Sequence, residues 1–479
     1  MTPAPSLASR VARNLLVLGG GRGIAAALQV VAFAVVAGHL GPAGLGIYAF
    51  AIAAVALVRL VPAFGFDVIA PRDLAQQPDL EPELVPTIAA LRVVLAACAY
   101  GLLAGLLVAV GYGRDAREAT LLAALTLVLV AGETFRASLA TRLRLAWAAA
   151  ADFLEGAVTL AGAIALAVAG ADVLPFVALY ALAKLVNVSV VMTGALRLAT
   201  YRWAPRPRAW WPLLREAAPL AAASLVITIY YRLDLVVLAR LASADDVGQY
   251  GLAVKFLDGS VLVTAVVVSV LQPVLARSTL AAPGVLQRRY GHAVHLMALL
   301  ALFVAVTGGM TGWRLLPSLP GLGAFEGGGV ALALLAPAAG IILIATIVQA
   351  TLLAARLESV VLRISLAGLV VNVALIAVLI PAFSYVGAAV ATTLTELVLI
   401  VLSLRAVRSR LALGWPLERL PALLATAALL ALALLPGYLL QPLVQLALGV
   451  GAFAAAALAT GALRLGELRL AVGRGAAAA

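Results

Sequence analysis

The feature that most constrains this chain is a succession of long apolar runs, separated by short segments that contain charged residues, glycine or proline. A transmembrane helix needs about 20 apolar residues, because the hydrocarbon layer is about 30 Å thick. Lipid offers no hydrogen bonds to the backbone, so spanning segments that are this long must be helices. Fourteen runs qualify, at residues 14–38, 46–69, 88–112, 119–139, 149–170, 174–196, 217–241, 248–274, 293–316, 329–353, 361–381, 385–404, 418–436 and 440–463. The sequence therefore predicts an all-α polytopic membrane protein with about 14 transmembrane helices.

The composition excludes a soluble globular domain, because 65% of the residues are hydrophobic and only 11% are charged. The 33 Lys and Arg residues outnumber the 21 acids, which raises the alternative of nucleic-acid binding. However, with a cytoplasmic N-terminus, 23 of these cations fall in inner segments and 4 in outer ones, which is the positive-inside pattern. We therefore expect no nucleic-acid partner, and we expect both termini on the cytoplasmic side. The single cysteine, Cys98, excludes an intramolecular disulfide.

An internal repeat suggests how the spans are grouped. A shift of 202 residues superposes four pairs, namely Arg13 on Arg215, Gly46 on Gly248, Tyr48 on Tyr250 and Pro71 on Pro273. An even number of spans separates the two copies, so both copies have the same orientation in the membrane. We expect an N-lobe of six helices at 1–200, a C-lobe of six helices at 201–411, and an added helix pair with a C-terminal tail at 412–479.

Six cations lie within predicted spans, where each costs about 2.5 to 3.5 kcal/mol if it faces lipid. They are Arg22, Arg59, Arg92, Lys184, Arg232 and Lys255. A helix over 217–241 places Arg232 and Asp234 on the edges of one polar face, too far apart around the helix to pair readily. Function is the favoured interpretation for Arg22 and Arg232. A fixed structural contact is an equal alternative for Arg59, Lys184 and Lys255, and Arg92 lies near enough to the inner end of its helix to reach the headgroups.

Acidic residues within the spans have two interpretations. Four of them, Glu155, Asp234, Asp258 and Glu396, are candidates for coupling transport to protons or sodium. Alternatively they compensate arginines, which we favour for Glu133 beside Arg136 and for Asp152. Asp258 lies three residues after Lys255, so an ion pair within one helix is as plausible there as a role in ligand binding.

Other chemistry finds little support in the sequence. The glycines around Arg22 follow no strand and lack the Lys-Ser/Thr of a nucleotide-binding P-loop. His292 and His295 share a helical face but lack further ligands, so we expect neither a metal nor a cofactor. A membrane-embedded polysaccharide polymerase or ligase would need a large catalytic outer loop, whereas the outer loops here are short. Transport is thus favoured over enzymatic activity.

Two stretches carry a resemblance to a known family. AGHLGPAGLGIYAFAIAAVALVRLVPAFGFDVIAPRDLA and NVALIAVLIPAFSYVGAAVATTLTELV resemble the signature regions of Wzx-like polysaccharide flippases. These flippases belong to the exporter superfamily that also contains the lipid II flippases and the multidrug and toxin extruders. The similarity extends over nearly the whole chain in helix number, lobe division and loops.

The resemblance implies a cavity lined by the first, second, seventh and eighth helices, which opens to each side of the membrane in turn. Arg22, Arg59, Arg232 and Lys255 belong to those helices, and Lys184 completes the proposed cationic set. The implied substrate is an undecaprenyl-diphosphate-linked oligosaccharide that is moved outward across the bacterial inner membrane. A lipid II flippase or a multidrug antiporter is the alternative. His39 stands where the family usually has a basic residue, which leaves a charged contact there in doubt.

Overall fold

The computed structural model describes residues 7–279, 284–414, 420–436 and 440–463, and no strand occurs among them. Nine helices in these ranges are long and apolar enough to cross a membrane. The count becomes ten if the segments Pro207–Ala222 and Ser224–Leu241, bent by 48°, form one further span. The predicted all-α class is confirmed, and it follows from the need to pair every backbone polar group within its own segment.

Two helices are long because each joins two predicted spans across a break. Helix α1 (Leu7–Val58) departs from helical geometry at Gly41, and α14 (Glu358–Leu411) does so at Ser384. Each break falls between two of the apolar runs in the sequence. Within the described ranges, each of the fourteen runs overlaps a helix, part of α1 or α14, or a series of short helices, and the run 46–69 extends from α1 through α2 into α3.

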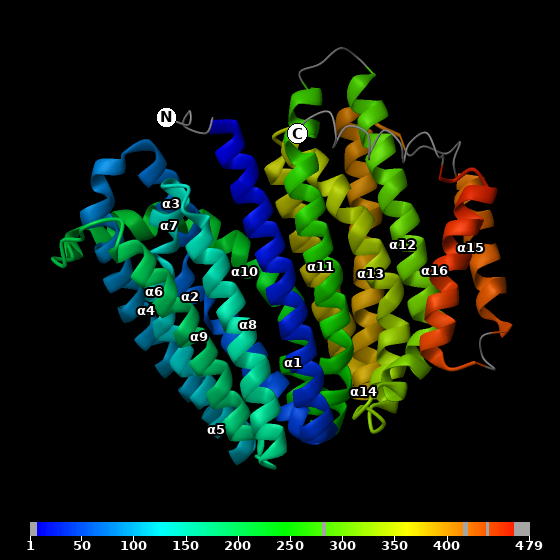
Figure 1. The fold of residues 1–479 in the computed structure, drawn as a ribbon, viewed down its shortest axis with the longest axis horizontal. Coiled ribbons are helices and arrows are strands. Elements are labelled where there is room, and N and C mark those ends of the chain that lie inside the picture. Colours follow the sequence, from blue (N-terminus) through cyan, green and yellow to red (C-terminus); the bar gives the residue numbers. More distant parts are fainter. Residues whose placement is uncertain (1–6, 280–283, 415–419, 437–439, 464–479) are drawn as a thin grey trace, which may run out of the picture. The chain divides into compact units, whose positions relative to one another are not determined.

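The first of two compact units comprises Met1–Gly248. Figure 1 shows α8 and α9 running alongside α1 in this unit. Between residues 114 and 141 the predicted span is not one helix but four short pieces in series. After α1, the helices of the unit are α2 (Leu60–Ala63), α3 (Phe66–Gln76), η1 (Pro78–Leu80), α4 (Glu81–Val110), α5 (Arg114–Ala124), η2 (Leu125–Leu129), α6 (Val130–Glu133), α7 (Arg136–Thr141), α8 (Leu145–Val168), α9 (Val173–Leu196), η3 (Pro207–Ala209) and α10 (Trp210–Leu241).

The second unit comprises Gln249–Ala479. It contains most of α11 (Ala244–Thr279), followed by α12 (Val285–Ser318), α13 (Glu326–Ala354), α14, α15 (Leu420–Leu434) and α16 (Pro442–Ala459). Helix α13 packs against both α12 and α14, and the α15–α16 pair contacts α12 (Figure 1). A largely apolar cavity of about 300 Å³ lies in this unit, between small residues of α12 and α13 that include Gly308, Gly312, Ala336 and Ala339. None of the predicted cationic site residues lines it.

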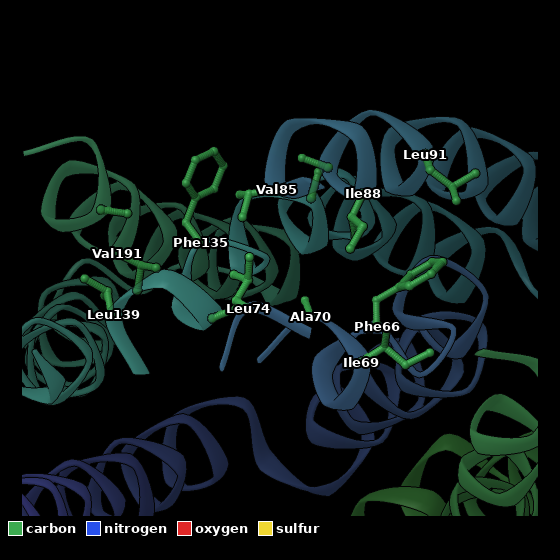
Figure 2. Close-up of a cluster of buried hydrophobic side chains, with 14 of the residues drawn as sticks. Phe66, Ile69, Ala70, Leu74, Val85, Ile88, Leu91, Phe135, Leu139 and Val191 are labelled. Atoms are coloured by element: carbon green, nitrogen blue, oxygen red, sulfur yellow. The ribbon is translucent and has the colours of Figure 1, made fainter. Parts of the chain in front are cut away.

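A tight left-handed turn separates α2 from α3. Phe64 has φ of 37° and Gly65 has φ of 75°, so the chain reverses its helical course within two residues. A Cβ at Gly65 would lie 3.2 Å from the carbonyl oxygen of Ala217 on α10, which also favours glycine there. The turn directs α3 into a buried cluster, and Figure 2 shows Phe66 of α3 facing Ile88 and Leu91 of α4.

The internal repeat is visible in the packing of the first unit. The repeat-related glycines touch reciprocally: a Cβ at Gly46 would lie 1.8 Å from the carbonyl oxygen of Ala244, and a Cβ at Gly248 would lie 1.8 Å from that of Pro42. Pro42 and Ala244 are themselves 202 residues apart, like the two glycines. The tyrosine of each copy, Tyr48 and Tyr250, is also buried. Tyr48 packs beside Phe33, and Tyr250 forms a hydrogen bond with Thr392 in the second unit.

Candidate functional site

Arg59, which immediately precedes α2, forms an ion pair with Glu133 at the end of α6. The sequence offers Arg59 no acid within a turn of its own helix, and the partner comes from 74 residues further along the chain. The side chain of Arg59 is 42% exposed, whereas that of Glu133 is 19% exposed. The Arg59 side chain is therefore more exposed than that of its compensating carboxylate.

Lys184 on α9 repeats this arrangement. Its Nζ lies 2.6 Å from Oε1 of Glu155 on α8, and Nε2 of Gln29 donates a 3.4 Å hydrogen bond to the same oxygen. The Lys184 side chain is 34% exposed and that of Glu155 is 9% exposed. Lys184 also interacts electrostatically with Glu133, which places the two ion pairs in one neighbourhood of the first unit. The structure thus brings together Arg59, Lys184 and Glu155 from the predicted set.

Arg136 takes part in a third ion pair of the first unit. Its Nη2 donates hydrogen bonds to Asp152 and to Asn187, both at 2.7 Å, and Asn187 in turn donates to Asp152 at 3.1 Å. The expected compensation of an arginine by Asp152 is confirmed. Glu133 also compensates an arginine, but that arginine is Arg59.

Arg92 does not reach the headgroups as its place in the sequence suggests. Its side chain is fully buried and makes an ion pair of 2.6 Å with Asp67. Further hydrogen bonds go to the backbone oxygens of Ala63 and Val130 and to the hydroxyl of Thr134. The expectation was wrong because the break after α2 opens carbonyl groups that draw the guanidinium inward, and sequence spacing along α4 carries no sign of them.

The other predicted site residues of the first unit are Arg22, Arg232 and Asp234. Arg22 lies on α1, and its side chain is outside the described part of the structure. Arg232 and Asp234 lie on α10, where Asp234 is buried and accepts a 2.7 Å hydrogen bond from the backbone of Leu235.

In the second unit, Lys255 lies 3.4 Å from Asp258 on the same helix, as the spacing allows. Glu396 is buried on α14. The predicted coupling acids are therefore divided between the two units.

Two histidines singled out in the sequence have structural contacts. His39 lies 2.8 Å from the carbonyl oxygen of Ala171 through Nε2, and His295 lies 2.7 Å from that of Ala462. Within the described ranges no group of three or more metal-binding side chains gathers.

Outside the spans, a small network fixes the loop at 197–206. Arg142 donates to both oxygens of Glu81, and these hydrogen bonds raise the pKa of Arg142 above the ordinary arginine value. Tyr201 donates a 2.9 Å hydrogen bond to Ser138, and burial raises the pKa of the Tyr201 phenol to about 12. Both groups therefore keep their protons at neutral pH.

The fold is shared with membrane transporters of known structure. A lipid II flippase, MurJ, in an inward closed conformation matches with a TM-score of 0.77 at 12% identity, covering 93% of this chain and 98% of that one. An inward-facing multidrug resistance MATE family transporter of the MOP superfamily matches with a TM-score of 0.63 at 13% identity, covering 81% and 94%. The Vibrio cholerae MATE transporter VcmN matches with a TM-score of 0.55 at 14% identity, covering 84% and 98%.

The amino-acid sequence then identifies the family of this helical membrane protein. Among curated proteins, none matches the chain. The family model described as polysaccharide biosynthesis protein matches residues 11–279, which is more than half of the 479 residues. The chain belongs to this family of polysaccharide biosynthesis proteins, and the fold that the resemblance implies is shared with MurJ and the MATE transporters.

Proposed function

We propose that this protein is a flippase that moves an undecaprenyl-diphosphate-linked oligosaccharide from the cytoplasmic to the outer leaflet by alternating access. Its family and its shared fold with MurJ and the MATE transporters support transport of a lipid-linked precursor. The protein would lie in the bacterial inner membrane with both termini in the cytoplasm, in accordance with the distribution of cations along the chain. It acts as a transporter rather than an enzyme.

The observation that carries the proposal is the asymmetry of the two ion pairs in the first unit. In each pair the carboxylate is the more buried partner and the cation keeps an exposed side. The carboxylates make the cations tolerable within the membrane when no substrate is bound, because an uncompensated charge there is costly. The exposed sides of Arg59 and Lys184 remain able to bind an anion.

A diphosphate suits these two cations. Its oxygens accept several charge-assisted hydrogen bonds, and the planar guanidinium of Arg59 matches phosphate geometry through two parallel N–H groups. Lys184 contributes a point charge with three donors. Arg22, Arg232 and Lys255 complete the proposed binding set, and the lobes at 1–200 and 201–411 with the added segment 412–479 are its framework.

The driving force is either the membrane potential or an ion. A lipid-linked diphosphate carries about two negative charges, so an inside-negative potential favours its outward movement. The coupling ion, H⁺ or Na⁺, would use one of the intramembrane acids. Glu155, Asp234 and Glu396 are buried and Asp258 is partly exposed beside Lys255.

The test is reconstitution of the purified protein in liposomes that contain a fluorescent undecaprenyl-diphosphate oligosaccharide. Arg59→Gln removes the charge and one of the proposed phosphate donors, so the initial flipping rate should fall about tenfold or more. Arg114→Gln is the matched control, because Arg114 is an exposed arginine at the start of α5 that also pairs with a glutamate, Glu118. An Arg59→Gln variant that flips as fast as this control would contradict the site.

Lipid II flipping is the second candidate function, favoured by the TM-score of 0.77 with MurJ. The same liposomes distinguish the two functions when lipid II and the lipid-linked oligosaccharide are supplied in competition. Faster movement of lipid II would replace the first candidate with the second. A multidrug antiporter predicts movement of organic cations instead, which the cationic set of the first unit disfavours.

A further inference from the structure

Arg92 occupies an unusual position between two very short helices of the first unit. Helix α2 has four residues and ends at Ala63, and α6 has four residues and begins at Val130. Nη2 of Arg92 donates to the carbonyl oxygen of Ala63 at 3.3 Å, and Nη1 donates to that of Val130 at 3.1 Å. One guanidinium therefore connects the end of α2 to the start of α6.

The two partners of the proposed substrate-binding ion pair lie at these two helices. Arg59 directly precedes α2, and its carbonyl oxygen accepts the backbone hydrogen bond from Ala63. Glu133 is the last residue of α6, and Thr134 after it accepts a 3.0 Å hydrogen bond from Arg92. We propose that Arg92 is a positioning residue that sets the separation of Arg59 and Glu133 by holding α2 and α6 together. This inference rests on the proposed function of Arg59 in binding the diphosphate.

Single-turn helices depend on outside contacts for their placement. The first turn of a helix makes few internal hydrogen bonds for the backbone freedom that it loses, so a four-residue helix is not stable by itself. Helix α2 is further isolated by the left-handed turn at Phe64 and Gly65. The position of Arg59 is therefore set by whatever holds the end of α2, and the described contacts there include Arg92.

The chemistry of Arg92 favours positioning over simple packing. A fully buried guanidinium contributes little net stability compared with an apolar side chain of similar volume. Its Nε is buried and has no hydrogen-bond partner among the described residues, so the side chain is not arranged to satisfy every donor. The Nη groups, in contrast, are directed to four acceptors at the two helices and at Asp67. Arginine presents two separate Nη groups that can bridge two helices in this way, whereas lysine has a single nitrogen.

A double-mutant cycle on flipping tests this role. Arg92→Lys keeps the charge but supplies a single nitrogen, so α2 and α6 lose their common anchor, and the substrate concentration at half-maximal rate should rise roughly tenfold. In an Arg59→Gln background the same change should add less than a factor of about two, because the residue to be positioned is absent. Thr134→Val removes one acceptor of Arg92 and should give a smaller rise in the same direction. Arg136→Lys, the same substitution at another paired intramembrane arginine, is the control and should leave the half-maximal concentration unchanged.

A structural readout separates this inference from the proposed function. In a Cys98→Ala background, a cysteine introduced by Glu133→Cys reports the position of α6 through its rate of modification by a small water-soluble thiol reagent. Arg92→Lys should change that rate severalfold, whereas Arg136→Lys should not. If Arg59→Gln leaves flipping intact but the modification rate responds, the proposed binding site is wrong and the positioning role of Arg92 stands.

Three outcomes would overturn the inference itself. An Arg92→Lys variant with a wild-type half-maximal concentration and an unchanged modification rate would show that the bridge has no positioning effect. Independent, multiplying effects of Arg92→Lys and Arg59→Gln would show that Arg92 acts on the general structure. If Arg92→Lys does not yield folded protein, an unchanged half-maximal concentration in Thr134→Val would also reject it.

Discussion

At the scale of single residues, several cations of the first unit are compensated by acids distant in sequence. Arg59 pairs with Glu133, Lys184 with Glu155 and Arg136 with Asp152. Such pairs reduce the cost of placing charge in the membrane while leaving each cation able to exchange its partner. Arg59 and Lys184 are therefore paired with acids, rather than the uncompensated cations that the sequence alone suggests.

The Lys184–Glu155 pair gives a prediction about stability and transport. Lys184→Met leaves Glu155 buried without its cation, which should destabilise the protein by on the order of 3 kcal/mol. The double variant Lys184→Met/Glu155→Gln removes both charges and should recover most of the thermal stability in detergent. It should still flip the lipid-linked oligosaccharide slowly, because the exposed ammonium is missing. Recovery of both stability and flipping would mean that Lys184 has only a structural role.

At the scale of elements, breaks in the helices place the functional groups. The left-handed turn after α2 ends the helix that follows Arg59, and the four pieces between residues 114 and 141 include α6, which ends at Glu133. Glycine at residues 46 and 248 permits a close contact between the backbones of two repeat-related segments. The sequence predicts the repeat but not this contact.

That contact predicts a large difference between glycine substitutions. A Cβ at Gly46 would overlap the carbonyl oxygen of Ala244 at 1.8 Å, so Gly46→Ala should lower the melting temperature by several degrees. Gly101→Ala and Gly105→Ala on α4 are matched controls, because an added Cβ there meets nothing within 4 Å. Alanine is the better helix former, so the controls should be neutral or slightly stabilising. Equal melting temperatures for all three variants would argue against the close approach at Gly46.

At the scale of the whole molecule, the chain is a polytopic helical protein of two compact units, and it belongs to a family of polysaccharide biosynthesis proteins. Its fold is that of transporters which bind different substrates. The fold alone therefore does not select a substrate, and the proposed cargo depends on the charges of the site.

The proposed anionic cargo predicts a response to voltage. Each charge that crosses the membrane gains about 2.3 kcal/mol per 100 mV, so a cargo with about two charges gains close to 5 kcal/mol at −100 mV inside. Outward flipping in liposomes should accelerate when a potassium diffusion potential makes the compartment that corresponds to the cytoplasm negative. It should slow when the potential is reversed. Flipping that is indifferent to voltage would instead indicate an electroneutral exchange, in which protons or sodium compensate the cargo.

The helical nature of the spans could be predicted from the sequence, because lipid imposes the same rule on every segment that crosses it. The break at Gly41 falls between two of the fourteen apolar runs. The choice of partners was decided only by the tertiary structure. Glu133 is 74 residues from Arg59, and the acceptors of Arg92 become available only where α2 and α6 are interrupted. Pairing across such separations depends on which helices pack together, which the local pattern of apolar residues does not encode.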